Sequence, residues 1–227
     1  IQDYINAYLW KSGVELKPQG EEMVLITKAV PEIHIKNHSY GYSAPFIKQT
    51  ASLLPILHET SANGVIHVFS AGNYRGQINE DANKVLTTSY RDVINVAALG
   101  SDGKFANYSC YGASIFVTAP SSRTEFYAKT TIPTGFGITT TDRTGIDLGY
   151  NAYSQNNRCI IGCGDIFESF PDYNYTSRFG GTSSSAPLVS GILALGKEAN
   201  PDMDVRMAKH IIVKTSDVVD PADASST

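Results

Sequence analysis

The sequence predicts an α/β domain with a mainly parallel central sheet. Apolar residues at helical spacing run through residues 47–58, and this helix ends at an Asn-Gly stop that the buried-type strand 65–69 follows at once. Residues 93–98 and 114–119 have the composition of two further strands. Because alternation of helices and strands is typical of a parallel sheet, we expect helices to cover its faces.

The N-terminal elements follow from the same kind of spacing. Apolar residues predict one helix over residues 4–9 and a second over residues 23–30, divided by the Lys-Pro-Gln-Gly segment 17–20. Residues 33–36 are β-compatible and predict a short strand that runs into a loop.

Residues 121–178 interrupt the alternation. They are rich in Thr, Gly, Asn, Asp and Tyr without a sustained period, so we expect a loop-rich insertion. A helix over residues 182–199 and a final helix, capped by Asp204 and running to about residue 214, are expected after it. One domain, incomplete at its start, is expected to cover residues 1–227.

Composition argues against several classes of protein. A chain of 227 residues with 42% hydrophobic residues can bury a core without a framework of disulfides from its three cysteines. The formal net charge of -4 and the lack of a basic run argue against a nucleic-acid surface. The apolar runs are far shorter than the roughly 20 residues needed to cross a bilayer, so no transmembrane segment is expected.

The most informative segment covers residues 180–191, where two glycines and a serine precede an apolar helix. Free N–H groups and the helix dipole at such a position stabilise an oxyanion, although a capping serine in a glycine-rich turn is the better explanation of a bare Gly-Thr-Ser. The longer pattern Gly-Thr-Ser-x-Ser-x-Pro-x-x-Ser-Gly over residues 181–191 resembles the active-serine signature of the subtilisin-like serine proteases. The resemblance implies that Ser183 is the nucleophile and that the fold has three layers.

The resemblance extends upstream. Residues 69–73, Phe-Ser-Ala-Gly-Asn, are similar to the strand end that carries the family's oxyanion-hole asparagine, which implies that Asn73 donates to the scissile carbonyl. The resemblance also implies two segments that bind substrate backbone. One is the edge segment, formed by Ser39, Tyr40 and Gly41, and the other is formed by Ser70, Ala71 and Gly72.

Within the family, residues 186–188 and 198–201 look more like the kexin and furin branch and its bacterial relatives. That branch often cleaves after basic residues, which its acidic substrate pocket binds. The acids are not clear here, because Ala44 follows the edge segment and Cys110 stands where an acid is expected. Asp81 is a candidate remnant, so basic specificity has little support.

The triad is incomplete in this sequence. The family's Asp-Ser/Thr-Gly and His-Gly-Thr motifs, which supply the orienting acid and the general base, do not occur. We interpret the four upstream histidines, at positions 34, 38, 58 and 67, as structural. The segment before Ser39 is too short for the missing motifs, so we expect them before Ile1 and expect residues 1–227 alone to be inactive.

The insertion contains two further candidate features. Cys159 and Cys163 could close a small disulfide or remain free thiols. Asp165, Glu168 and Asp172 could ligate a structural calcium ion, although a solvated acidic loop is the simpler interpretation. No cofactor is expected for catalysis.

These features together predict a serine endopeptidase that acts on peptides or proteins through an acyl-enzyme on Ser183. The resemblance alone implies a secreted, cell-surface or periplasmic location. One alternative is a pseudoprotease that has kept the fold for binding or regulation. Another is an amidase with a Gly- and Ser-rich signature, which would leave the Asn73 strand end unexplained.

Overall fold

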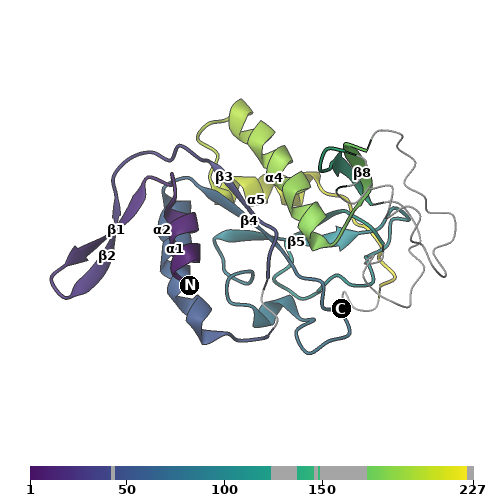
Figure 1. Ribbon diagram of the computed structural model, residues 1–227, viewed down its shortest axis with the longest axis horizontal. Helices are drawn as coiled ribbons and strands as arrows, with labels where there is room; N and C mark the ends of the chain where they lie inside the picture. Colours follow the sequence, from purple (N-terminus) through teal and green to yellow (C-terminus); the bar gives the residue numbers. More distant parts are fainter. Residues whose placement is uncertain (42–43, 124–136, 146–147, 149–172, 224–227) are drawn as a thin grey trace.

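A four-stranded parallel sheet organises the chain in this computed structural model, which describes all residues except 42–43, 124–136, 146–147, 149–172 and 224–227 (Figure 1). Its order is β3-β4-β5-β6, and all three neighbouring pairs are parallel. The strands are β3 (Ile35–His38), β4 (Ile66–Ser70), β5 (Val93–Leu99) and β6 (Val117–Pro120). The predicted parallel sheet is confirmed, with β3 and β6 displaced from the expected ranges toward higher residue numbers.

One face of the sheet is covered by α4 (Thr182–Ala199) and α5 (Val205–Thr215). This face has an apolar core, because alternate residues of the central strands point the same way and meet the buried side of α4. The core consists of Ile66, Val68, Ile94, Val96, Ala119, Ala186, Val189, Leu193, Met203, Ala208 and Ile212. Both helices match the predicted ranges, and Asp204 caps α5 by accepting a hydrogen bond from the backbone N–H of Met207 at 2.7 Å.

The opposite face is covered by α1 (Gln2–Leu9) and α2 (Leu54–Ala62). Their core with the sheet consists of Tyr8, Leu53, Ile56, Leu57, Phe69 and Val93. The predicted first helix is confirmed. The helix expected from residue 47 begins as a 3-10 segment, η1 (Lys48–Leu53), and becomes α-helical where Pro55 occupies its first turn.

The helix expected over residues 23–30 is wrong. Residues 14–27 form an antiparallel hairpin of β1 (Val14–Gln19) and β2 (Glu22–Thr27), which extends away from the sheet in Figure 1. Gly20, with φ of +67°, allows the tight connection between Gln19 and Glu22. Cross-strand pairing stabilises a segment whose apolar residues also fit a helical period, so tertiary context overrides the local pattern.

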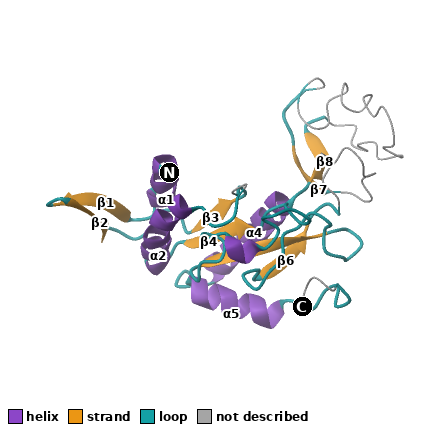
Figure 2. Cartoon of the chain, turned by 90° about the horizontal axis from the view of Figure 1, so that it is seen from below, coloured by secondary structure: helices purple, strands orange, loops and turns teal. Residues whose placement is uncertain are grey.

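A second antiparallel pair, β7 (Ile138–Thr141) and β8 (Tyr175–Phe179), lies within and at the end of the segment 121–178. The sequence pattern of this loop-rich segment indicated neither strand. Figures 1 and 2 show that this pair and the β1–β2 hairpin lie at opposite ends of the molecule. The predicted cysteine pair and acidic cluster, Cys159, Cys163, Asp165, Glu168 and Asp172, lie outside the described residues.

Over the described part of the chain, each helix is too short or too polar to cross a membrane.

Candidate active site

Ser183 is the second residue of α4, directly after a constrained turn. The N-cap residue Gly181 has φ of +77°, and a Cβ atom there would lie 2.9 Å from the side-chain nitrogen of Asn73, so only glycine fits. Gly181 is held on both sides, because its N–H donates to the Tyr108 hydroxyl at 3.0 Å and its carbonyl accepts from Ser121 at 2.9 Å. The turn therefore presents Ser183 at a rigid helix N-terminus.

Asn73 follows β4 and is fixed by the residue before Ser183. Its Oδ1 accepts hydrogen bonds from the backbone N–H and the hydroxyl of Thr182, both at 2.9 Å, and the Thr182 hydroxyl also accepts from the N–H of Gly72 at 3.1 Å. These contacts orient the amide. Its Nδ2 group and the N–H of Ser183 have no hydrogen-bond partner within the described residues, so both can donate to a ligand.

Two hydrogen bonds between Ser39 and Ser183 join the edge segment to the same turn, and a proline in α4 leaves one of the acceptors open. Pro187 has no N–H, so the Ser183 carbonyl four residues earlier lacks its usual helical donor. The Ser39 hydroxyl donates to that carbonyl at 2.9 Å. The Ser183 hydroxyl in turn donates to the Ser39 carbonyl at 3.4 Å. This reciprocal pair fixes the end of β3 against the start of α4.

A cleft of about 320 Å³ opens beside Ser183. Its lining contains Tyr40, Gly41, Ser70, Gly72, Asn73, Tyr74, Gln77, Thr182 and Ser183. Most of the residues predicted from the sequence are thus brought together. Ser39 and Ala71 are the exceptions. Ser39 bonds to Ser183 without lining the cleft, and Ala71 is buried with its N–H paired to the Val96 carbonyl at 2.9 Å.

Sequence reasoning missed three residues of the lining. Thr182 orients Asn73, and its place immediately before Ser183 was a usable signal. Tyr74 and Gln77 belong to the loop after Asn73, where the local pattern indicates only a turn. Their position in the cleft depends on how that loop folds back.

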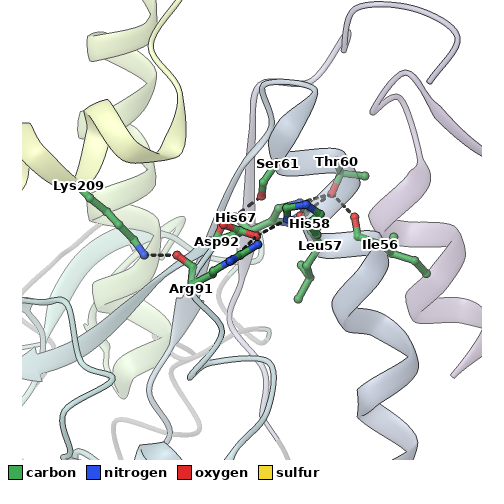
Figure 3. Close-up of polar contacts among 9 residues, drawn as sticks. All are labelled: Ile56, Leu57, His58, Thr60, Ser61, His67, Arg91, Asp92 and Lys209. Atoms are coloured by element: carbon green, nitrogen blue, oxygen red, sulfur yellow. Dashed lines mark hydrogen bonds and ion pairs between the residues drawn. The ribbon is translucent and has the colours of Figure 1, made fainter. Parts of the chain in front are cut away.

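None of the five histidines, all described, forms a hydrogen bond with Ser183. His34 precedes β3 and is exposed, and His210 is exposed on α5. His58 of α2 pairs with Asp92, the residue before β5, at 2.7 Å, as Figure 3 shows. The remaining two, His38 and His67, are buried in the core under α1 and α2.

His38 and His67 form the centre of a buried hydrogen-bond chain. His38 contacts His67 through Nε2 and Nδ1 at 2.9 Å, and the other nitrogen of His67 contacts the Thr60 hydroxyl at 2.8 Å. The other nitrogen of His38 contacts the Tyr40 hydroxyl at 3.0 Å, and that hydroxyl donates to Tyr8 at 2.8 Å. This chain links the edge segment to α1 and α2.

Both rings are neutral at neutral pH. Burial, together with the nearby charge of Lys36, lowers the pKa of His38 to about 3, and burial and the two neighbouring basic groups lower the pKa of His67 well below its usual value. A neutral ring has one donor and one acceptor, so two adjacent rings can form a continuous chain only with matched tautomers. The chain therefore holds Tyr40 in one position beside the cleft.

Lys36 of β3 anchors α1 to the same region. Its buried ammonium donates to the carbonyls of Ala7, Tyr8 and Trp10 at 3.0, 2.6 and 2.6 Å. These carbonyls end the helix, so the lysine satisfies acceptors that the helix itself leaves open and complements the helix dipole. Burial lowers the pKa of Lys36 to about 8.

Comparisons with known proteins agree with this architecture. The model of the subtilase family matches residues 9–226. A calcium-dependent protease of Trichormus variabilis is 32% identical over 161 residues, which cover 71% of this chain and 21% of that protein. The extracellular serine protease of Aeromonas sobria is 32% identical over 125 residues, or 55% of this chain and 19% of that protein.

Two further matches concern the branch and the fold. PC3-like endoprotease variant B of Hydra vulgaris is 48% identical over 48 residues, 21% of this chain and 7% of that protein, as expected for kexin-like relatives. A protease structure from Pseudoalteromonas arctica aligns with a TM-score of 0.63 and 25% identity, covering 96% of this chain and 52% of that one. The chain thus spans about a fifth of the first curated relatives it matches. This chain belongs to the subtilase family.

Proposed function

We propose that this chain is part of a secreted serine endopeptidase that hydrolyses peptide bonds through an acyl-enzyme on Ser183. The observation that carries the proposal is the orientation of Asn73, whose Oδ1 is occupied by Thr182 while its Nδ2 and the Ser183 N–H remain able to donate. Two such donors beside a hydroxyl suit a tetrahedral oxyanion. The extracellular serine protease of Aeromonas sobria supports the assignment to secretion.

In the proposed reaction, the Ser183 oxygen attacks the peptide carbonyl carbon and the hydroxyl proton passes to a general base. That base returns the proton to the departing amine as the peptide C–N bond breaks. Water then attacks the ester, the base takes its proton, and the carboxylic acid product leaves as Ser183 regains its hydrogen. Residues 39–41 and 70–72 hold the substrate backbone beside the cleft.

We assign the general base and its orienting acid to a histidine and an aspartate outside residues 1–227. Two features support a place for that segment: β3 is the outer strand of the described sheet, and α4 exposes Ile192 and Leu195. An open strand edge and an apolar helix surface together provide packing for another element. In its absence Ser183 has no base, so residues 1–227 alone should not hydrolyse peptides.

Calcium binding stays a prediction. No cluster of three acidic, histidine or cysteine side chains suited to a metal occurs within the described ranges. The predicted acidic cluster at residues 165–172 lies outside them, and the calcium dependence of the Trichormus variabilis relative is stated of that protein. No step of the proposed reaction uses a metal.

A fluorophosphonate probe applied to the full-length protein tests the proposal. We expect one adduct, located at Ser183 by peptide mass spectrometry and lost in Ser183→Ala. Ser190→Ala, which changes another serine of the same helix, should label normally. Folded full-length protein that leaves Ser183 unlabelled would contradict the proposal and favour the pseudoprotease alternative.

A further inference from the structure

The edge segment after β3 is anchored on both faces of the sheet. Side chains alternate along an extended chain, so Ser39 faces α4 whereas His38 and Tyr40 face α1 and α2. On the α4 side, Ser39 and Ser183 exchange two hydrogen bonds. On the other side, the Tyr40 hydroxyl belongs to the buried hydrogen-bond chain, which it joins through His38 at 3.0 Å. Because the anchors act on adjacent residues, they fix the backbone of the segment from opposite directions.

The ring of His38 is held by contacts on its face, its edge and both nitrogens. It stacks on the ring of Phe69 at a centroid distance of 4.2 Å, and the ring of Tyr8 meets it edge-on at 5.0 Å. Its nitrogens contact Tyr40 at 3.0 Å and His67 at 2.9 Å. The ring therefore cannot move without loss of the stack or of a buried hydrogen bond.

The order of protons along the buried hydrogen-bond chain makes His38 the donor to the edge segment. The Tyr40 hydroxyl gives its single proton to Tyr8 at 2.8 Å, so the Tyr40 oxygen accepts from Nδ1 of His38. A neutral ring has one N–H, so Nε2 of His38 accepts from Nδ1 of His67. Loss of the His38 nitrogens would thus leave both Tyr40 and His67 with an unmet contact.

The far end of the buried hydrogen-bond chain lies on α2. The Thr60 hydroxyl lies 2.8 Å from Nε2 of His67 and 2.7 Å from the carbonyl of Ile56, so its proton has an acceptor on either side (Figure 3). When Thr60 donates to His67, each contact from α2 to α1 has one donor and one acceptor. The position of Tyr40 is in this way tied to two helices that lie outside the cleft.

We propose that His38 is a positioning residue for substrate binding, which holds residues 39–41 in place for the substrate backbone through the Tyr40 hydroxyl. The inference rests on the proposed function, in which these residues bind the substrate. Tyr40 and Gly41 line the cleft, whereas His38 is 5% exposed and does not line it. A segment that is not held in advance must be ordered at each binding event, which weakens binding. His38 should therefore affect KM rather than the chemistry at Ser183.

Hydrolysis of an extended peptide by the full-length protein tests this role. His38→Phe keeps a ring that can stack on Phe69 but removes both nitrogens. We expect KM to rise about fivefold while kcat changes by less than about twofold, the pattern that loss of binding shared by ground state and transition state produces. Tyr8→Phe removes the acceptor of the Tyr40 proton and should raise KM about twofold. An unchanged KM in both variants would overturn the proposal.

Leu57→Ala is the matched control for loss of stability. Leu57 is fully buried in the same core, and its side chain takes no part in hydrogen bonding. The substitution should destabilise the protein at least as much as His38→Phe in urea denaturation and leave KM at the wild-type value. An equal rise in KM in the two variants would show that general destabilisation raises KM, and would overturn the positioning role.

A double-mutant cycle tests the route through the Tyr40 hydroxyl. In a Tyr40→Phe background that hydroxyl is absent, so His38→Phe should raise KM much less than it does in the wild type. Independent effects of the two substitutions on KM would refute the route. If His38→Phe does not fold, the cycle of Tyr8→Phe with Tyr40→Phe makes the same test from α1.

The rate at which a small fluorophosphonate modifies Ser183 separates positioning from chemistry. We expect His38→Phe to label within about twofold of the wild-type rate, because such a probe does not need the edge segment. A fall in labelling that matches the loss of peptide hydrolysis would place His38 in the chemical step and overturn this inference. Wild-type protein that neither labels nor cleaves a peptide would instead contradict the proposed function.

Discussion

The two faces of the central sheet are stabilised by different kinds of interaction. Toward α4 and α5, β4 presents Ile66 and Val68, which pack in an apolar core. Toward α1 and α2, the alternate residues of the same strand are His67 and Phe69, and His67 belongs to the buried hydrogen-bond chain. Side chains alternate between the two faces along one strand. One face is therefore stabilised by apolar burial, whereas the other also requires that each buried hydrogen-bond donor meets an acceptor.

This difference has a consequence for the site. The apolar face supports the rigid helix that carries Ser183, and apolar burial does not depend on protonation. The polar face supports Tyr40 and the edge segment, where every buried donor needs its acceptor. Changes in pH or in single polar atoms should therefore affect the edge segment more than α4.

The largest expected effect is the removal of the buried ammonium on the polar face. Lys36→Met leaves three carbonyls at the end of α1 without their donor, so we expect the free energy of unfolding to fall by about 4 kcal/mol. Urea denaturation measures this. Lys17→Met on exposed β1 makes the same chemical change and should cost less than about 0.5 kcal/mol; equal losses would show that the buried contacts are unimportant.

On the apolar face, Leu193→Ala should lower the free energy of unfolding by about 3 kcal/mol, because it leaves a cavity between α4 and the sheet. Val213, on α5 and 64% exposed, provides the control. Val213→Ala should change the free energy of unfolding by less than about 0.5 kcal/mol. Similar values for the two variants in urea denaturation would contradict the assigned face of α4.

Acidification should weaken the polar face selectively. The pKa of His38 is about 3 in the folded chain and near 6.5 when unfolded, so the unfolded chain binds more protons between these values and stability falls as pH drops below about 6.5. At pH 5 the loss from His38 alone is about 2 kcal/mol relative to pH 7.5, and His67 acts in the same direction.

Urea denaturation at several pH values isolates this effect. Leu193→Ala should keep the wild-type slope of stability against pH, because it alters the apolar face. His38→Met should be less stable at pH 7.5 but have a shallower slope, whereas His210→Gln on exposed α5 should keep the slope. A His38→Met slope equal to that of wild type would refute the pH assignment.

The smallest effect concerns the contact that joins the edge segment to α4. Ser39→Ala removes the donor to the Ser183 carbonyl and should lower the free energy of unfolding by about 1 kcal/mol. Pro187→Ala restores a helical N–H at that carbonyl, so Ser39→Ala should cost less in that background. A double-mutant cycle measures the coupling, and additive effects would show that the proline does not create the need for Ser39.

The sequence by itself determined the elements whose signals are local. The pattern over residues 181–191 specified the glycine turn, the serine and the helix after it, and Asp204 specified the start of α5. The strands β4 and β5 were predictable because both faces of a covered parallel strand are buried, which leaves a continuous apolar run. The family followed from short motifs of this kind, and the oxyanion role of Asn73 stays a prediction from them.

Tertiary structure decided what depends on partners far along the chain. Residues 23–30 fit a helical period, yet pairing with β1 makes residues 22–27 a strand. Lys36 and His67 look like ordinary strand residues until the end of α1 and the side chains of α2 provide acceptors and donors. The lining of the cleft likewise depends on the loop after Asn73, which brings Tyr74 and Gln77 beside Ser183. Periodicity records which side chains are buried, but only the folded chain determines which polar atoms they meet.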